Sequence, residues 1–121
     1  MARLIRVSDP DFVIGQGDTG PDLDVYLEDA VGARPALTGA AITFRMRRRG
    51  SSSVLVAGTA DAHADQVTEK GRCAYTWASD DTAVAGPYEA DFEVVWAGGE
   101  RITFPNEVPF IVEVVETVRG A

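Results

Sequence analysis

The amino-acid sequence predicts an all-β domain in which two sheets pack as a sandwich, and two observations predict it. Apolar and polar side chains alternate with a period of two through most of the chain, the pattern of strands with one buried face. Turn-forming sequences separate these runs at intervals of about eight to twelve residues, which is typical of antiparallel β-sandwiches. Because a single sheet would leave one apolar face in water, two sheets must pack together. We therefore expect about seven to nine antiparallel strands.

The alternation places the expected strands in order along the chain. Residues 22–28 carry Leu23, Val25 and Leu27 on the inward face. The next expected strands, with their inward residues, are 42–47 (Ile42, Phe44, Met46), 72–77 (Cys73, Tyr75, Trp77), 88–96 (Tyr88, Ala90, Phe92, Val94, Trp96), 102–104 (Ile102, Phe104) and 110–114 (Phe110, Val112, Val114). The turn "AGGE", Ala97–Glu100, predicts a hairpin in which both glycines adopt positive φ.

We expect at most one short helical turn, near Ser79–Ala85, because only "SDDTAVAG" combines capping residues with a terminal glycine. Ser79 or Asp80 would begin it and Gly86 would end it. Tyr88 follows directly, at the start of the most regular strand. Immunoglobulin-like domains often place a Tyr at such a corner, where its hydroxyl bonds to the backbone just upstream. The alternative is that Tyr88 is simply the first core aromatic of its strand. We favour an immunoglobulin-like β-sandwich.

The length of 121 residues suits one domain. We expect an N-terminal arm or first strand at residues 1–9, the sandwich at 10–117 and a short tail at 118–121. The arm, with Arg3, Leu4, Ile5, Arg6 and Val7, either adds to the sheet edge of a neighbouring molecule or forms the domain's own first strand. The N-terminus lacks the pattern of a signal peptide, and no apolar run reaches the roughly 20 residues that span a bilayer.

The formal net charge of −8 argues against nucleic acid and anionic membranes as partners, because both require a surplus of basic side chains. The only local basic cluster is "RMRRRG", in which Arg45 and Arg47 lie on the wet face and Arg48 follows. Asp22 and Asp24 lie on the wet face of their own strand. We expect these charges to pair between neighbouring strands or between copies of the protein, with solvation of each charge as the alternative.

Few residues are candidates for chemistry, and we expect no enzyme and no cofactor. The only histidine, His63, lies in a polar stretch, and the only cysteine, Cys73, is expected to be a small buried thiol. No carboxylate falls at an apolar position that would raise its pKa. The acids Asp18, Asp22 and Asp24 lack the spacing of a calcium loop, although irregular calcium sites at the end of a sandwich stay open.

Several segments between Asp11 and Glu116 form a recognisable series: "LTGA" before "ITFRMR", an aromatic strand, "AGPYEADFEV" and "TFPN". In this series the chain resembles the N-terminal domain of the baseplate upper proteins of tailed bacteriophages. The resemblance implies an immunoglobulin-like structural protein of the virion, made in the host cytoplasm, with phage capsid or tail proteins as partners and several copies per particle. It carries over no catalytic residue and leaves open whether the location is capsid, tail or baseplate.

A carbohydrate-binding or host-adhesion module is the alternative function. Its sugar platforms would come from Tyr26, Tyr75, Trp77 and Trp96. Alternation turns Trp77 and Trp96 inward, which disfavours both as platforms.

Overall fold

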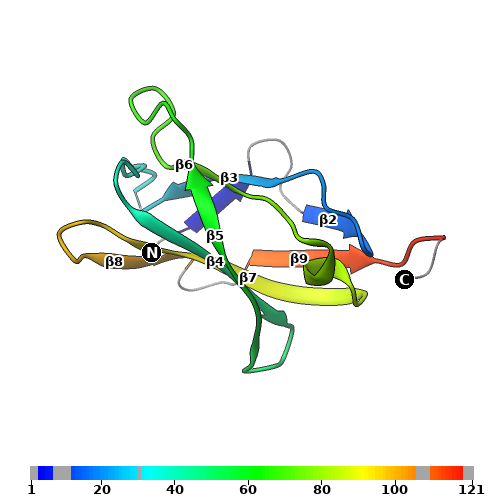
Figure 1. The fold of residues 1–121 in the computed structure, drawn as a ribbon. Helices are drawn as coiled ribbons and strands as arrows, with labels where there is room; N and C mark the ends of the chain where they lie inside the picture. Colours follow the sequence, from blue (N-terminus) through cyan, green and yellow to red (C-terminus); the bar gives the residue numbers. More distant parts are fainter. Residues whose placement is uncertain (1–2, 7–11, 30, 106–109, 119–121) are drawn as a thin grey trace.

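The computed structural model describes residues 3–6, 12–29, 31–105 and 110–118. Within them the chain forms nine strands and one short helix (Figure 1). The elements are β1 (Arg3–Arg6), β2 (Phe12–Gly15), β3 (Leu23–Glu28), β4 (Ala41–Arg48), β5 (Val54–Ala62), β6 (Arg72–Tyr75), the 3₁₀ helix η1 (Ser79–Thr82), β7 (Gly86–Val95), β8 (Arg101–Phe104) and β9 (Phe110–Val115).

The strands form the immunoglobulin-like sandwich that the alternation predicts. One sheet has the order β1-β3-β6, and the other contains β4-β7-β9-β2, with β8 paired to the far half of β7. In an immunoglobulin domain these positions correspond to strands A, B and E of one sheet and C, F and G of the other. The long strand β5 pairs with β4 along most of its length and then with β6 through Asp61 and Ala62, so it joins the two sheets.

One strand pair departs from the expected antiparallel arrangement. β2 pairs with β9 in parallel, from Phe12 opposite Val112 to Gly15 opposite Val115. β1, by contrast, pairs antiparallel with β3 in the other sheet. The chain therefore passes from one sheet to the other between its first two strands, and β2 reaches β9 running in the same direction.

The core lies between the sheets and follows the predicted alternation. Phe44 of β4 stacks on Tyr75 of β6 with ring centroids 4.4 Å apart, and Phe12 of β2 stacks on Trp77 at 5.6 Å. Trp77 lies two residues beyond the end of β6 and is nevertheless buried. These ring contacts join elements of both sheets and thereby fix how the sheets face one another.

The predicted tyrosine corner is confirmed. Tyr88 is buried, and its hydroxyl donates a hydrogen bond of 2.6 Å to the carbonyl of Val84, four residues upstream. The bond fixes the path from η1 into β7.

Some local expectations were wrong. Ala78, not Ser79 or Asp80, precedes η1, and its amide donates to the Asp81 carboxylate at 2.9 Å. Gly86 begins β7 instead of ending the helix. In the β7–β8 turn, only Gly99 of the two glycines has a positive φ, at 92°.

Candidate interaction surface

The chemically reactive residue types take structural roles. The Nδ1 atom of His63 accepts a hydrogen bond of 3.1 Å from the amide of Asp65, so this ring caps a turn. Cys73 is buried, and desolvation raises the pKa of its thiol to about 12. The Asp65 carboxylate accepts bonds from the Thr68 hydroxyl and from the amides of Thr68 and Val67, and the Thr68 side chain is the largest cause of its lowered pKa. His63 and Asp65 therefore stabilise the β5–β6 loop, and Cys73 packs in the core.

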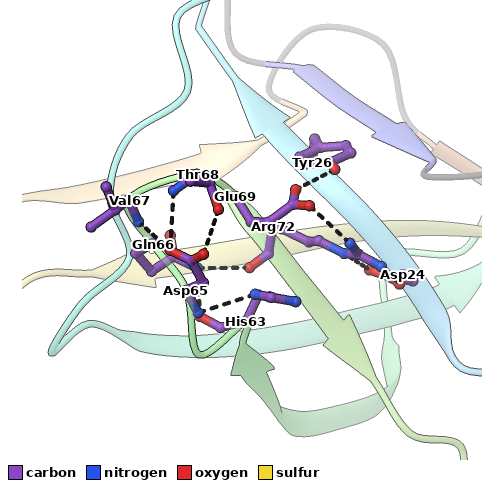
Figure 2. Close-up of polar contacts among 9 residues, drawn as sticks. All are labelled: Asp24, Tyr26, His63, Asp65, Gln66, Val67, Thr68, Glu69 and Arg72. Carbon is purple, nitrogen blue, oxygen red and sulfur yellow. Dashed lines mark hydrogen bonds and ion pairs between the residues drawn. The ribbon is translucent and has the colours of Figure 1, made fainter.

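The buried side chain of Gln66 anchors the β5–β6 loop to its surroundings (Figure 2). Its Oε1 accepts from the amides of Leu37 at 3.0 Å and Gly71 at 3.1 Å. Its Nε2 donates to the carbonyls of His63 at 2.8 Å and Arg72 at 3.1 Å. The amide thus makes four bonds and fixes the loop against the β3–β4 connection. Nothing in the sequence predicted that Gln66 anchors this loop, because an isolated Gln in a polar stretch is expected to be exposed to solvent.

A second cluster covers the outer face of β3 and β6. Arg72 pairs with Asp24 at 2.8 Å and with Glu69 at 3.4 Å, and the Tyr26 hydroxyl donates to Glu69 (Figure 2). The guanidinium of Arg34 lies over the Tyr26 ring, 4.0 Å from its centroid. Asp24 is therefore engaged by an arginine. In the described part of the chain, no group of three or more His, Cys, Asp or Glu residues is placed to hold a metal ion.

Arg45 and Arg47 pair with carboxylates of the neighbouring strand, as the first of the three sequence hypotheses expects. Arg45 makes two bonds to Asp91, of 2.8 and 3.0 Å, and Arg47 bonds to Glu89 at 3.0 Å. Glu93 lies 3.5 Å from Arg45. The acids belong to β7, not to the strand of Asp22 and Asp24, because β3 lies in the opposite sheet.

The β4–β5 connection projects from the sandwich and is drawn at the bottom of Figure 1. We call residues Arg48–Leu55 the hairpin tip. Opposite Met46 stands Val56, whereas opposite Arg47 stands Val54, so Leu55 is an extra residue in β5. Such a bulge redirects side chains. Leu55 and Val54 are 59% and 54% exposed.

Two arginines complete the hairpin tip. Arg48 and Arg49 are both exposed, and the Arg48 guanidinium lies 5.6 Å from the centroid of the Tyr88 ring. The tip therefore combines apolar and positively charged surface, a composition that suits contact with another macromolecule.

The remaining predicted interaction residues lie elsewhere. Arg3, Leu4, Ile5 and Arg6 form β1, which pairs with this domain's own β3, whereas Val7 lies outside the described residues. The described part of the arm is thus a strand of the sandwich. Asp22 is exposed and directly precedes β3.

The aromatic rings considered as sugar platforms are largely occupied. Tyr75 and Trp77 are buried, and the Nε1 of Trp96 donates to the carbonyl of Ala36 at 2.9 Å. Arg34 covers one face of Tyr26. Hence none of these four rings presents a free, fully exposed stacking face.

Among the helices that the described residues form, none has the length and apolar character needed to cross a bilayer.

Comparisons with known proteins show the fold alone. No protein-family model matches the chain, and no curated protein matches it. Among solved structures, the chain is similar to CopC from Methylosinus trichosporium OB3b, with a TM-score of 0.52 and 11% sequence identity over 96% of this chain and 95% of that one. Two chains this different in sequence share an architecture, from which no activity follows.

Proposed function

We propose that this chain is a non-enzymatic structural protein of a tailed bacteriophage virion, which docks on capsid or tail proteins by surface complementarity. The observation that carries the docking role is the hairpin tip, in which Val54, Leu55, Arg48 and Arg49 are all exposed. The assignment to a phage particle is supported by the sequence resemblance from Asp11 to Glu116.

The distribution of polar contacts supports an interaction module over a catalyst. A general base or nucleophile needs a poised side chain beside a site for substrate. Here His63, Cys73 and Asp65 are engaged in turns or in the core, and Arg45 and Arg47 are paired with acids of β7.

Detection of the chain in particles tests the proposal. Phage particles released by a host that carries the gene would be purified on a density gradient and analysed by quantitative mass spectrometry. We expect the chain to co-sediment with the major capsid protein at a fixed ratio, and a gene deletion to remove it from the particles. If the chain is expressed but stays at the top of the gradient, the virion role is wrong.

A further inference from the structure

The hairpin tip differs from the rest of its sheet because its arginines have no acidic partner among the described residues. Arg45 and Arg47 each bond to a carboxylate of β7, whereas Arg48 and Arg49, one step further along the hairpin, form no ion pair within the described part of the chain. Unpaired cations beside exposed Leu55 are unexpected in a chain with a net charge of −8. The tip is therefore a candidate contact for an acidic surface.

An acidic surface of this kind lies at the same end of the molecule. Three segments, residues 16–22, 79–84 and 115–118, meet there, and we call them the acidic end. The amide of Gly17 bonds to the carbonyl of Thr82 at 2.9 Å, and the amide of Gln16 bonds to the carbonyl of Val115 at 2.7 Å. These segments contain no lysine or arginine.

Exposed groups on the acidic end match those of the hairpin tip. Its exposed carboxylates are Asp22, Asp80 and Glu116. Three exposed apolar side chains accompany them: Val84 at 53%, Val115 at 40% and the fully exposed Val118. The acidic end thus offers negative charge and apolar surface together, the complement of the tip.

The tip and the acidic end are neighbours. The amide of Arg49 bonds to the carbonyl of Pro87 at 3.1 Å, and Tyr88, beneath Arg48, bonds to the carbonyl of Val84. Figure 1 shows the β4–β5 hairpin projecting at the bottom of the view, with η1 and the last residues of β9 to its right. Opposite charges that lie side by side on one surface are self-complementary under a two-fold axis, since each patch then faces its opposite on the second molecule.

We propose that two copies of this chain associate through this surface as a two-fold dimer. The hairpin tip of each copy lies on the acidic end of the other, so that Arg48 and Arg49 face Asp80 and Glu116 of the second copy. Leu55 and Val54 become buried against the apolar residues of that end. The inference rests on the docking role and narrows it: the partner of the hairpin tip is a second copy of this chain, so the tip joins copies that lie together on the particle.

Charge reversal tests the dimer directly. The purified full chain would be followed by sedimentation velocity and light scattering up to about 100 µM, a concentration that populates dimers of micromolar affinity. We expect a dimer for the wild type. Arg48→Glu with Arg49→Glu, and separately Asp80→Lys with Glu116→Lys, weaken association at least about tenfold, since each sets like charges opposite one another.

An equimolar mixture of the two reversed variants provides the decisive result. In a two-fold dimer of one variant with the other, acidic tip faces basic end and basic tip faces acidic end, so both contacts are attractive. We expect dimers to return in the mixture. Lys70→Glu with Arg101→Glu is the matched control, which changes the net charge by the same amount at exposed positions away from this surface and leaves the dimer intact.

Several outcomes would overturn the dimer: a wild-type monomer at every concentration, reversed variants that associate as well as wild type, a mixture that stays monomeric, or open-ended polymers. If a reversed variant fails to fold by circular dichroism, Leu55→Asp tests the same surface and is expected to abolish the dimer. A dimer that is absent from particles would refute the virion role alone. A monomer that is present in particles would refute the dimer alone.

Discussion

A single hydroxyl closes the corner between η1 and β7. The phenol of Tyr88 is buried, and it satisfies the carbonyl of Val84 with a 2.6 Å bond. We expect Tyr88→Phe to lower the free energy of unfolding by about 1–2 kcal/mol, the typical contribution of such a bond. Urea denaturation measures the change. Val84→Ala is the control, because it keeps the carbonyl and trims an exposed side chain, and an equal loss in both variants would contradict the corner's role.

Because the Cys73 thiol is buried, we expect the free energy of unfolding to fall as the pH rises above about 9. Burial raises the pKa of its thiol from 9.0 to about 12, so the folded protein holds this proton more tightly than the unfolded chain. Between pH 9 and 12 the unfolded chain loses the proton first, and the thiol's contribution to stability falls by about 1.4 kcal/mol per pH unit. Below pH 9 the contribution is constant.

Comparison with Cys73→Ala isolates this effect. The variant loses packing at every pH but has no thiol to ionise, whereas the tyrosines with raised pKa values act equally in both proteins. We expect the stability difference between wild type and variant to be constant up to about pH 8 and to shrink by roughly 1–2 kcal/mol by pH 10.5. Urea titrations at several pH values measure it, and a difference independent of pH would show that the thiol is not buried.

At the scale of elements, the alternation located most strands but marked neither β2 nor β5. β3, β4, β7 and β9 alternate strongly, so their inward faces follow from the sequence. β5 reads "VLVAGTADA", with small residues and weak alternation, and was not predicted as a strand. Its neighbours explain its composition. Gly58 lies against the Tyr75 ring, and the end of the strand pairs with β6 of the other sheet. That information resides in tertiary contacts, not in local propensity.

The small residue at position 58 is required by this arrangement. Gly58 stands opposite Phe44 in the ladder, and a Cβ there would lie 2.7 Å from Cε1 of Tyr75. We expect Gly58→Ala to destabilise the protein by about 1–3 kcal/mol, because the Tyr75 ring is held between Phe44 and its bond to Asp81. Gly98→Ala is the control, since no atom lies within 4 Å of the added carbon. Thermal unfolding compares the two, and equal melting temperatures would contradict the close packing.

The candidate surface was only half predictable. Alternation correctly turned Arg45 and Arg47 outward, but which strand supplies their acids depends on strand order, which alternation does not encode. The exposure of Leu55 arises from a bulge that appears only when β4 and β5 are paired. The opposed charges of the tip and the acidic end come from segments far apart in the chain, and only the fold brings them together.

At the scale of the whole molecule, the sandwich depends on the pairing of β2, near the N-terminus of the chain, with β9, near its C-terminus. β9 lies between β7 and β2, pairing with one in antiparallel and with the other in parallel register, and its Val112 and Val114 are buried. Among the described strands, β2 pairs with β9 and lies at the end of the strand order. Without β9, β2 loses its strand partner, and the first half of β7 keeps only its ladder with β4.

We therefore expect a chain that stops before Phe110 to lack a cooperative unfolding transition, although it retains eight of the nine strand-forming segments, seven of which stay connected by pairing. Loss of two buried valines and release of β2 together exceed the roughly 5–15 kcal/mol that stabilises a domain of this kind. Circular dichroism during heating measures the transition. A chain that stops after Val118 keeps β9 and is expected to melt like the full chain. A cooperative transition in the shorter chain would mean that β3, β4, β6 and β7 hold the sheets together without the pairing of the two ends.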